Sequence, residues 1–88
     1  MQNVSYKILM ISSSQIKAAR SLVGWSMQVL AERSGVSLIT IKRYEAASDI
    51  PKGKVVQLMK IKTALEAAGI EFIGDPLESP GVRLHHKG

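Results

Sequence analysis

The sequence predicts a mainly α-helical domain that is followed by a short β-hairpin. Three observations favour this fold class. Apolar residues recur every three or four positions between residues 14 and 69, serine and glycine residues stand where successive helices would begin and end, and apolar residues alternate with polar ones after Gly69. We therefore divide the chain into an N-terminal arm or short strand (residues 1–13), a helical domain (residues 14–69) and a hairpin with its tail (residues 70–88).

Length and composition exclude several classes of protein. The chain has 88 residues, no cysteine and 45% hydrophobic residues, which argues against a disulfide scaffold, a zinc finger and a disordered tail. No apolar run approaches the roughly 20 residues of a membrane helix, so we expect a cytoplasmic protein. Residues 14–62 hold nine of the 12 Lys and Arg residues but only three of the seven Asp and Glu residues. Positive charge gathered in one helical segment favours a polyphosphate partner over an ordinary solvated surface.

The first helix is predicted over residues 14–23 and ends at Gly24. One face of it is apolar and should be buried: Ile16, Ala19, Leu22 and Val23. The serines at 12–14 come just before this helix, and capping explains them better than a catalytic role.

The second and third helices are predicted from two copies of one capping pattern. Ser26 offers a side-chain oxygen to the free N–H groups of a helix that ends at Gly35, and Ser37 does the same for a helix that includes residues 40–45. Apolar pairs flank both caps as in a hydrophobic staple: Trp25 with Leu30, and Val36 with Ile41. Two capped helices separated by a Gly-Val turn predict a bihelical unit.

The remaining elements are a long helix and the hairpin. Residues 49–53 are predicted to form a loop, because Pro51 disfavours helix before it and Gly53 is a frequent helix breaker. The fourth helix follows, with Gly69 at its C-terminus and an apolar stripe of Val55, Leu58, Ile61, Leu65 and Ala68. Alternating apolar residues on either side of a proline-containing loop then predict a hairpin over residues 70–84.

Residues 14–69 resemble the phage-repressor-like (Cro/Xre) family of helix-turn-helix DNA-binding proteins. With Met27 as the first position of the twenty-residue bihelical unit, the family's small, glycine and aliphatic positions are occupied by Ala31, Gly35 and Ile41. Ala31 allows close helix approach, Gly35 permits a positive φ, and Ile41 fills the angle between the helices. The resemblance implies a lambda-repressor-like four-helix domain.

The same resemblance implies an ion pair and reveals two departures. Arg20 and Glu45 match the family's pair that ties the first helix to the recognition helix. Met27 stands where glutamine is common, which puts that residue's phosphate contact in doubt. Ala47 stands where a helix-ending glycine is common, so the third helix is expected to run on for a turn or to end less sharply.

Function in this family follows from placing the third helix in the major groove of double-stranded DNA. The residues expected to contact bases are Ser37, Leu38, Ile39, Lys42 and Arg43. Arg43 suits the O6 and N7 of guanine, and the two aliphatic residues suit thymine methyl groups, unless one of them packs inside. The residues expected to contact phosphates are Lys17, Ser26, Thr40, Lys52 and Lys54, although any one lysine could be only a solubility charge.

We therefore expect a transcriptional regulator, not an enzyme, and we expect it to need no cofactor or metal. His85 and His86 lack further ligands at metal-binding spacing, and no Gly-rich phosphate loop exists. The small core makes a homodimer plausible, with the hairpin pairing across a two-fold axis or, alternatively, only covering the first and fourth helices. Repression by covering a promoter is the simplest mechanism, and contact with RNA polymerase would allow activation. The competing function is a protein-interaction module, such as an antitoxin or antiactivator that uses the hairpin.

Overall fold

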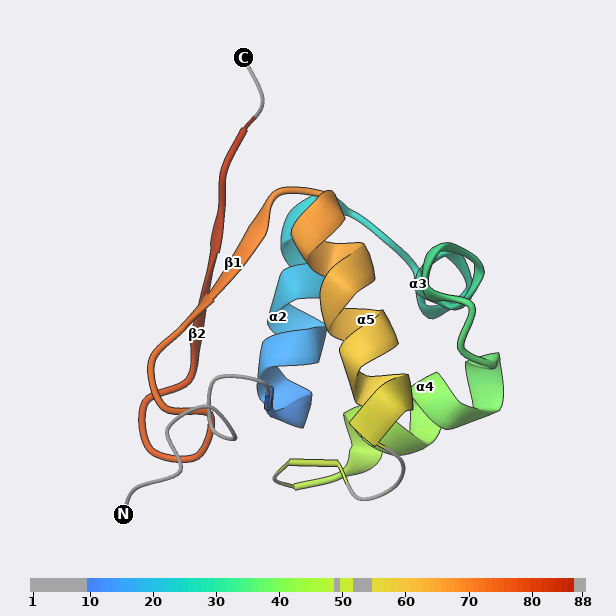
Figure 1. The fold of residues 1–88 in the computed structure, drawn as a ribbon, viewed down its shortest axis with the longest axis horizontal. Helices are drawn as coiled ribbons and strands as arrows, with labels where there is room; N and C mark the ends of the chain where they lie inside the picture. Colours follow the sequence, from blue (N-terminus) through green and yellow to red (C-terminus); the bar gives the residue numbers. More distant parts are fainter. Residues whose placement is uncertain (1–9, 49, 52–54, 87–88) are drawn as a thin grey trace.

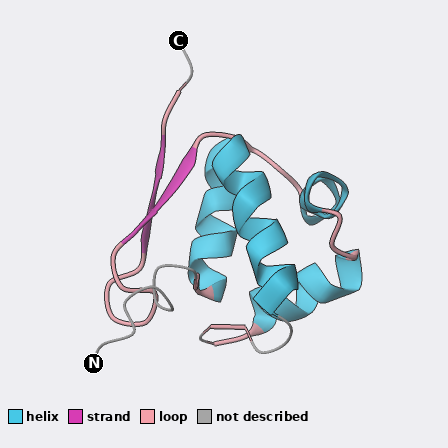
Figure 2. Ribbon diagram, viewed as in Figure 1, coloured by secondary structure: helices cyan, strands magenta, loops and turns pink. Residues whose placement is uncertain are grey.

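The computed structural model describes residues 10–48, 50–51 and 55–86, and these form four helices and one two-stranded sheet (Figures 1 and 2). This confirms the predicted fold class. In chain order the elements are α2 (Ser13–Val23), α3 (Met27–Ser34), α4 (Leu38–Ala46), α5 (Val55–Ala67), β1 (Ile70–Ile73) and β2 (Gly81–Leu84). Residues 1–9 of the predicted N-terminal arm or short strand lie outside the described residues.

Side-chain caps fix where the first three helices begin. The hydroxyl oxygens of Ser12, Ser26 and Ser37 each accept a hydrogen bond from the backbone N–H three residues later. Because Ser12 is the first cap, α2 begins one residue earlier than predicted. Gly24 and Gly35 end α2 and α3 with φ of 72° and 75°, a region that L side chains rarely adopt. Local sequence signals therefore place these helix ends.

The core lies between the helices and the inner face of the hairpin. It is built from Ile11, Ile16, Ala19, Leu30, Val36, Ile41, Tyr44, Leu58, Ile61, Leu65 and Ile70. Two residues assigned to buried faces are exposed instead, since Leu22 and Val55 are each 47% exposed, and two others, Val23 and Ala68, are only half-buried. Leu22 lines a surface hollow beside the end of β2. Val55 is the first residue of α5 and lies about one turn before Leu58, the first core residue of that helix.

The hairpin packs on α2 and α5, on the side away from α3 and α4 (Figure 1). Its strands are antiparallel, with Ile70 opposite Leu84 and Phe72 opposite Val82. These four apolar residues pack against the core, whereas Glu71 and Arg83 are exposed. The hairpin thus covers the first and fourth predicted helices inside one subunit, which leaves its strand edges, not its apolar face, for any pairing between subunits.

A buried polar junction joins the start of α2 to the hairpin and to the end of α4. The side-chain amide of Gln15 donates to the carbonyl oxygens of Ile73 and Gly81, at 3.3 and 3.0 Å, and its Oε1 accepts from the backbone N–H of Ser12 at 2.9 Å. The hydroxyl of Ser13 donates to the carbonyl oxygen of Ala47. Each of these buried polar groups therefore has a partner on another element or in the helix cap.

Ala47 also decides how α4 ends. The helix stops at Ala46 and Ala47 adopts an extended conformation, with φ −68° and ψ 153°. The helix therefore does not run on for a turn. Because the Ser13 hydroxyl satisfies the Ala47 carbonyl, the chain leaves α4 without a left-handed glycine.

Candidate nucleic-acid interface

The outward face of α4 is the centre of the candidate interface. Ile39, Lys42 and Arg43 are exposed on it, and the Ile39 side chain is 75% exposed. These residues are three and four positions apart, so they share one side of the helix. The opposite side is buried and consists of Ile41, Tyr44 and Glu45. The helix can therefore meet a partner with one face while the other holds it in the fold.

Leu38 lies between these two sides. It is half-buried, unlike its neighbour Ile39, because it precedes the buried Ile41 by three positions and Glu45 by seven. Leu38 consequently exposes less apolar surface to the major groove of a DNA duplex than expected from the sequence.

The two hydroxyl groups at the start of α4 have different hydrogen-bonding capacity. Ser37 donates its hydroxyl proton to Oγ1 of Thr40 at 2.9 Å and accepts from the Thr40 backbone N–H at 3.2 Å. Thr40 therefore keeps its own hydroxyl proton, which suits a phosphate oxygen because phosphate oxygens accept hydrogen bonds. Ser37 keeps acceptor capacity, which suits the amino group of adenine or cytosine in a major groove.

Arg43 leans toward the C-terminal end of α4. Its guanidinium carbon lies 5.8 Å from the centre of the Tyr44 ring, and the two residues line a hollow of about 430 Å³ that also includes Ala47 and Pro51. Because Tyr44 is buried, its ring is held in place and the Arg43 guanidinium contacts a fixed surface. Reaching a guanine would require leaving this ring, at a cost of about 0.5–1 kcal/mol for an exposed cation–π contact.

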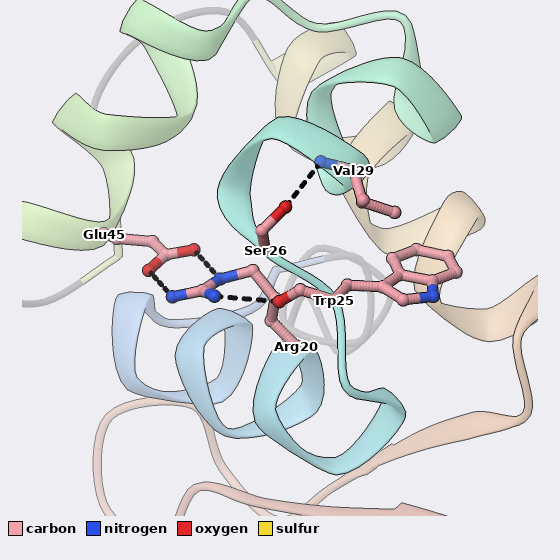
Figure 3. A network of polar contacts seen from close by, with 5 residues as sticks. All are labelled: Arg20, Trp25, Ser26, Val29 and Glu45. Carbon is pink, nitrogen blue, oxygen red and sulfur yellow. Dashed lines mark hydrogen bonds and ion pairs between the residues drawn. The ribbon is translucent and has the colours of Figure 1, made fainter.

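The residues expected to contact phosphates are spread over several elements. Ser26 caps α3 by accepting from the Val29 backbone N–H at 3.1 Å (Figure 3), and Lys17 is exposed on α2. Lys52 and Lys54 lie outside the described residues. Met27 is half-buried against the core, so this position supplies packing in place of the phosphate contact of a glutamine.

An ion pair holds α2, α4 and the turn before α3 together (Figure 3). Nε and Nη2 of Arg20 donate to the two carboxylate oxygens of Glu45 at 2.8 and 2.9 Å, and Nη1 donates to the Trp25 carbonyl oxygen at 2.9 Å. The hydrogen bond to Glu45 raises the pKa of Arg20, and burial opposes this shift only in part. The structure thus brings together the two residues that the resemblance pairs, and their contact fixes the recognition helix against α2.

The exposed side of the hairpin carries a cluster that was not expected from the sequence. Nε2 of His85 lies 2.6 Å from Oε1 of Glu71, and Nη1 of Arg83 lies 3.3 Å from the same oxygen. The hydrogen bond with His85 is the main reason why the pKa of Glu71 is lowered. Within residues 10–48, 50–51 and 55–86, no three His, Cys, Asp or Glu residues gather as metal ligands.

Comparison with known families identifies the bihelical unit. A family model described as helix-turn-helix matches residues 16–59, which is half of the chain and includes most of α2, all of α3 and α4, and the start of α5. The chain belongs to the phage-repressor-like helix-turn-helix family. It is accordingly a DNA-binding transcriptional regulator, with α4 as the second helix of the helix-turn-helix. The comparison with curated proteins found no match. In the part of the chain that the structure describes, no helix combines the length and hydrophobicity needed to cross a membrane.

Proposed function

We propose that this helix-turn-helix regulator binds a pseudo-palindromic operator as a homodimer and represses transcription by covering promoter DNA. The observation that carries the proposal is the outward face of α4, where an aliphatic and two basic side chains are exposed while the opposite side is buried. An Ile side chain that is 75% exposed contributes nothing to the core, and apolar contact with thymine methyl groups gives it a role.

Base recognition is assigned to Ser37, Leu38, Ile39, Lys42 and Arg43. Arg43 pairs with guanine O6 and N7, Ser37 accepts from a base amino group, and Lys42 donates to a base acceptor. Leu38 adds a smaller apolar contact because it is half-buried. Phosphate contacts come from Lys17, Ser26, Thr40, Lys52 and Lys54, and they orient the subunit without reading sequence.

The dimensions of the subunit support a dimer on one face of the duplex. The chain measures 38 × 33 × 19 Å along its principal axes, so two subunits side by side have centres roughly one subunit width apart. Half-sites in successive major grooves are about 34 Å apart, which is a similar distance. A dimer that neutralises about eight phosphates should give a slope near −7 for log K against log salt concentration.

The proposal is tested by selecting duplexes from a randomised pool and then measuring binding by fluorescence anisotropy. Arg43→Ala should relax preference at one base pair per half-site, by about 5- to 150-fold, which corresponds to 1–3 kcal/mol. Lys17→Ala and Lys52→Ala should weaken all sequences alike, and each should reduce the salt slope by about 1 for every phosphate that is no longer neutralised. Arg83→Ala, on the exposed side of the hairpin, is the matched control and should change neither property.

Two DNA-binding results would contradict the proposal. A pool that yields no enriched sequence, or Arg43→Ala and Lys17→Ala proteins that bind every duplex as the unchanged chain does, would favour the protein-interaction module. Sedimentation equilibrium with the selected duplex separately tests the stoichiometry of two subunits per operator.

A further inference from the structure

A groove between α3 and α5 is lined by none of the residues assigned to the DNA interface. It is a surface hollow of about 500 Å³, bounded by Arg33 and Ser34 at the end of α3 and by one face of α5. On α5 its residues include Val56, Met59, Thr63 and Ala67, which recur at helical spacing. We call this hollow the α3–α5 groove.

The floor of the α3–α5 groove exposes more apolar surface than the fold requires. Val56 is 61% exposed and Met59 is 38% exposed, although α5 buries Leu58, Ile61 and Leu65 on its other side. A second hollow, of about 170 Å³, shares Arg33, Ala64 and Ala67 with the groove and continues it to Trp25. The apolar residues of the two hollows thus adjoin one another beneath a polar rim.

The charges around the α3–α5 groove select the partner. Arg33 and Lys60 line it, and no Asp or Glu of the described residues lines either hollow. Arg33 is held at the rim, because its guanidinium carbon lies 5.2 Å from the centre of the Trp25 ring. Among the residues that the structure describes, neither Arg33 nor Lys60 forms an ion pair with a carboxylate.

These observations disfavour two other occupants. A second copy of the chain placed symmetrically over the groove would bring Arg33 and Lys60 of both copies together without a carboxylate from the groove lining between them, which is a repulsive arrangement. Duplex DNA would satisfy the two cations but would leave the apolar floor against phosphates and sugars. An acidic partner with apolar side chains could bury the apolar floor and also pair its carboxylates with Arg33 and Lys60.

We propose that the α3–α5 groove binds an acidic amphipathic helix of a partner protein. From Val56 to Ala67 the face of α5 extends over eleven residue steps, about 16 Å at 1.5 Å per residue, which matches three turns of a bound helix. Apolar side chains of that helix contact Val56 and Met59, and its carboxylates pair with Arg33 and Lys60. This is the helix-in-groove mode of recognition, with charge selecting the partner.

The test uses the full chain and the fluorescence of Trp25, the only tryptophan in the sequence. The probe is a fourteen-residue peptide, roughly four helical turns long, with leucine at helical spacing and glutamate elsewhere. Two control peptides replace every glutamate by lysine or scramble the leucine spacing. We expect saturable quenching or a shift of Trp25 emission with the acidic peptide, and at least tenfold weaker binding of both controls.

Charge reversal makes the test specific for the groove. The double variant Arg33→Glu, Lys60→Glu should prefer the lysine peptide, and Met59→Glu should weaken the acidic peptide at least tenfold. Arg83→Glu makes the same change of charge on the exposed side of the hairpin and should leave peptide binding unchanged. Circular dichroism verifies that the variants are folded, and Met59→Ala, which adds no charge, provides a milder probe of the same contact.

Three results overturn the proposal. Absence of acidic-peptide binding, or binding that ignores the charge reversal, removes the recognition argument. A sedimentation mass that falls from dimer to monomer on Met59→Glu assigns the face to a second copy. Weaker binding of all duplexes by the double variant than by Arg83→Glu assigns Arg33 and Lys60 to DNA. None of these results depends on whether the chain represses transcription, so they leave the proposed function separately testable.

Discussion

Removing one partner of the ion pair between Arg20 and Glu45 should strongly destabilise the fold, because the remaining group would be left without its partner in a site mostly withdrawn from water. The Glu45 side chain is 7% exposed and the Arg20 side chain 21% exposed. Glu45→Gln keeps the shape of the side chain but removes its charge, which leaves the guanidinium with the Trp25 carbonyl and an uncharged amide as partners. Removing one member of a buried pair costs about 3–5 kcal/mol. The partial exposure of Arg20 places our expectation near about 3 kcal/mol.

This destabilisation is large for a chain of this size. Domains typically have about 0.05–0.15 kcal/mol of stability per residue, which is roughly 4–13 kcal/mol for 88 residues. Each kcal/mol changes the Tm of such a domain by about 4–8 °C, so Glu45→Gln should lower it by about 12–24 °C. Urea denaturation followed by circular dichroism measures the free energy, and thermal denaturation measures the Tm.

A second ion pair provides the control. Nζ of Lys62 lies 2.6 Å from Oε2 of Glu66, which is shorter than either hydrogen bond between Arg20 and Glu45. The two cations are similarly buried, with Lys62 16% and Arg20 21% exposed, so the pairs differ in their carboxylates: Glu66 is 44% exposed and Glu45 is 7% exposed. Glu66→Gln makes the same chemical change and should cost at most about 0.5 kcal/mol. Similar destabilisation by Glu45→Gln and Glu66→Gln would refute the argument that burial, not distance, sets the strength of the pair.

A double variant separates the interaction between Arg20 and Glu45 from the contribution that each side chain makes through its other contacts. Arg20→Gln combined with Glu45→Gln leaves no lone charge in the site, so its destabilisation should be smaller than the sum of the two single effects. Strict additivity would mean that the two side chains stabilise the fold independently of each other.

Further predictions concern the core, the loop glycines and pH. Leu65→Ala removes a side chain that is 0% exposed and should cost about 2–5 kcal/mol by urea denaturation, whereas Leu77→Ala, at a position 58% exposed, should cost under about 0.5 kcal/mol. Gly74→Ala should lower the urea midpoint more than Gly24→Ala. Both positions have positive φ, but of the two only Gly74 would bring a Cβ against a backbone carbonyl, that of Ser79; equal midpoints would contradict this. Because the pKa of Glu71 is lowered, its carboxylate stabilises the fold above its ordinary pKa of 4.5, and this contribution disappears as pH falls through the lower folded-state pKa. The Tm difference between the unchanged chain and Glu71→Gln should therefore vanish at low pH, and a difference that persists at the lowest pH would count against the assignment.

Most of the fold follows from short-range signals in the sequence. Ser26 and Ser37 cap helices through N–H groups three residues away, and Gly24 and Gly35 end helices by their own conformation. Such interactions involve neighbours along the chain, so the residue types reveal them directly. The exposed face of α4 could likewise be predicted from helical periodicity, except that Leu38 falls at the border between the two sides.

The contacts that sequence reasoning missed join distant parts of the chain. Gln15 reaches carbonyl groups 58 and 66 positions later, and Ser13 reaches Ala47, 34 positions later. Nothing in the local pattern identifies a backbone carbonyl as the partner of a side chain. The pairing of His85 with Glu71 similarly depends on the register of the hairpin, which the long loop does not specify from sequence.

The polar junction at the start of α2 has a consequence for how the molecule opens. If the hairpin peeled away, the Gln15 amide would lose both carbonyl acceptors, and displacing the last turn of α4 would break the bond from Ser13. Opening there exchanges these hydrogen bonds for bonds to water, at a net cost of about 0.5–1.5 kcal/mol for each. Local fraying of either element is thereby suppressed, and amide protons in β1 and in α4 should exchange with solvent through the same cooperative opening.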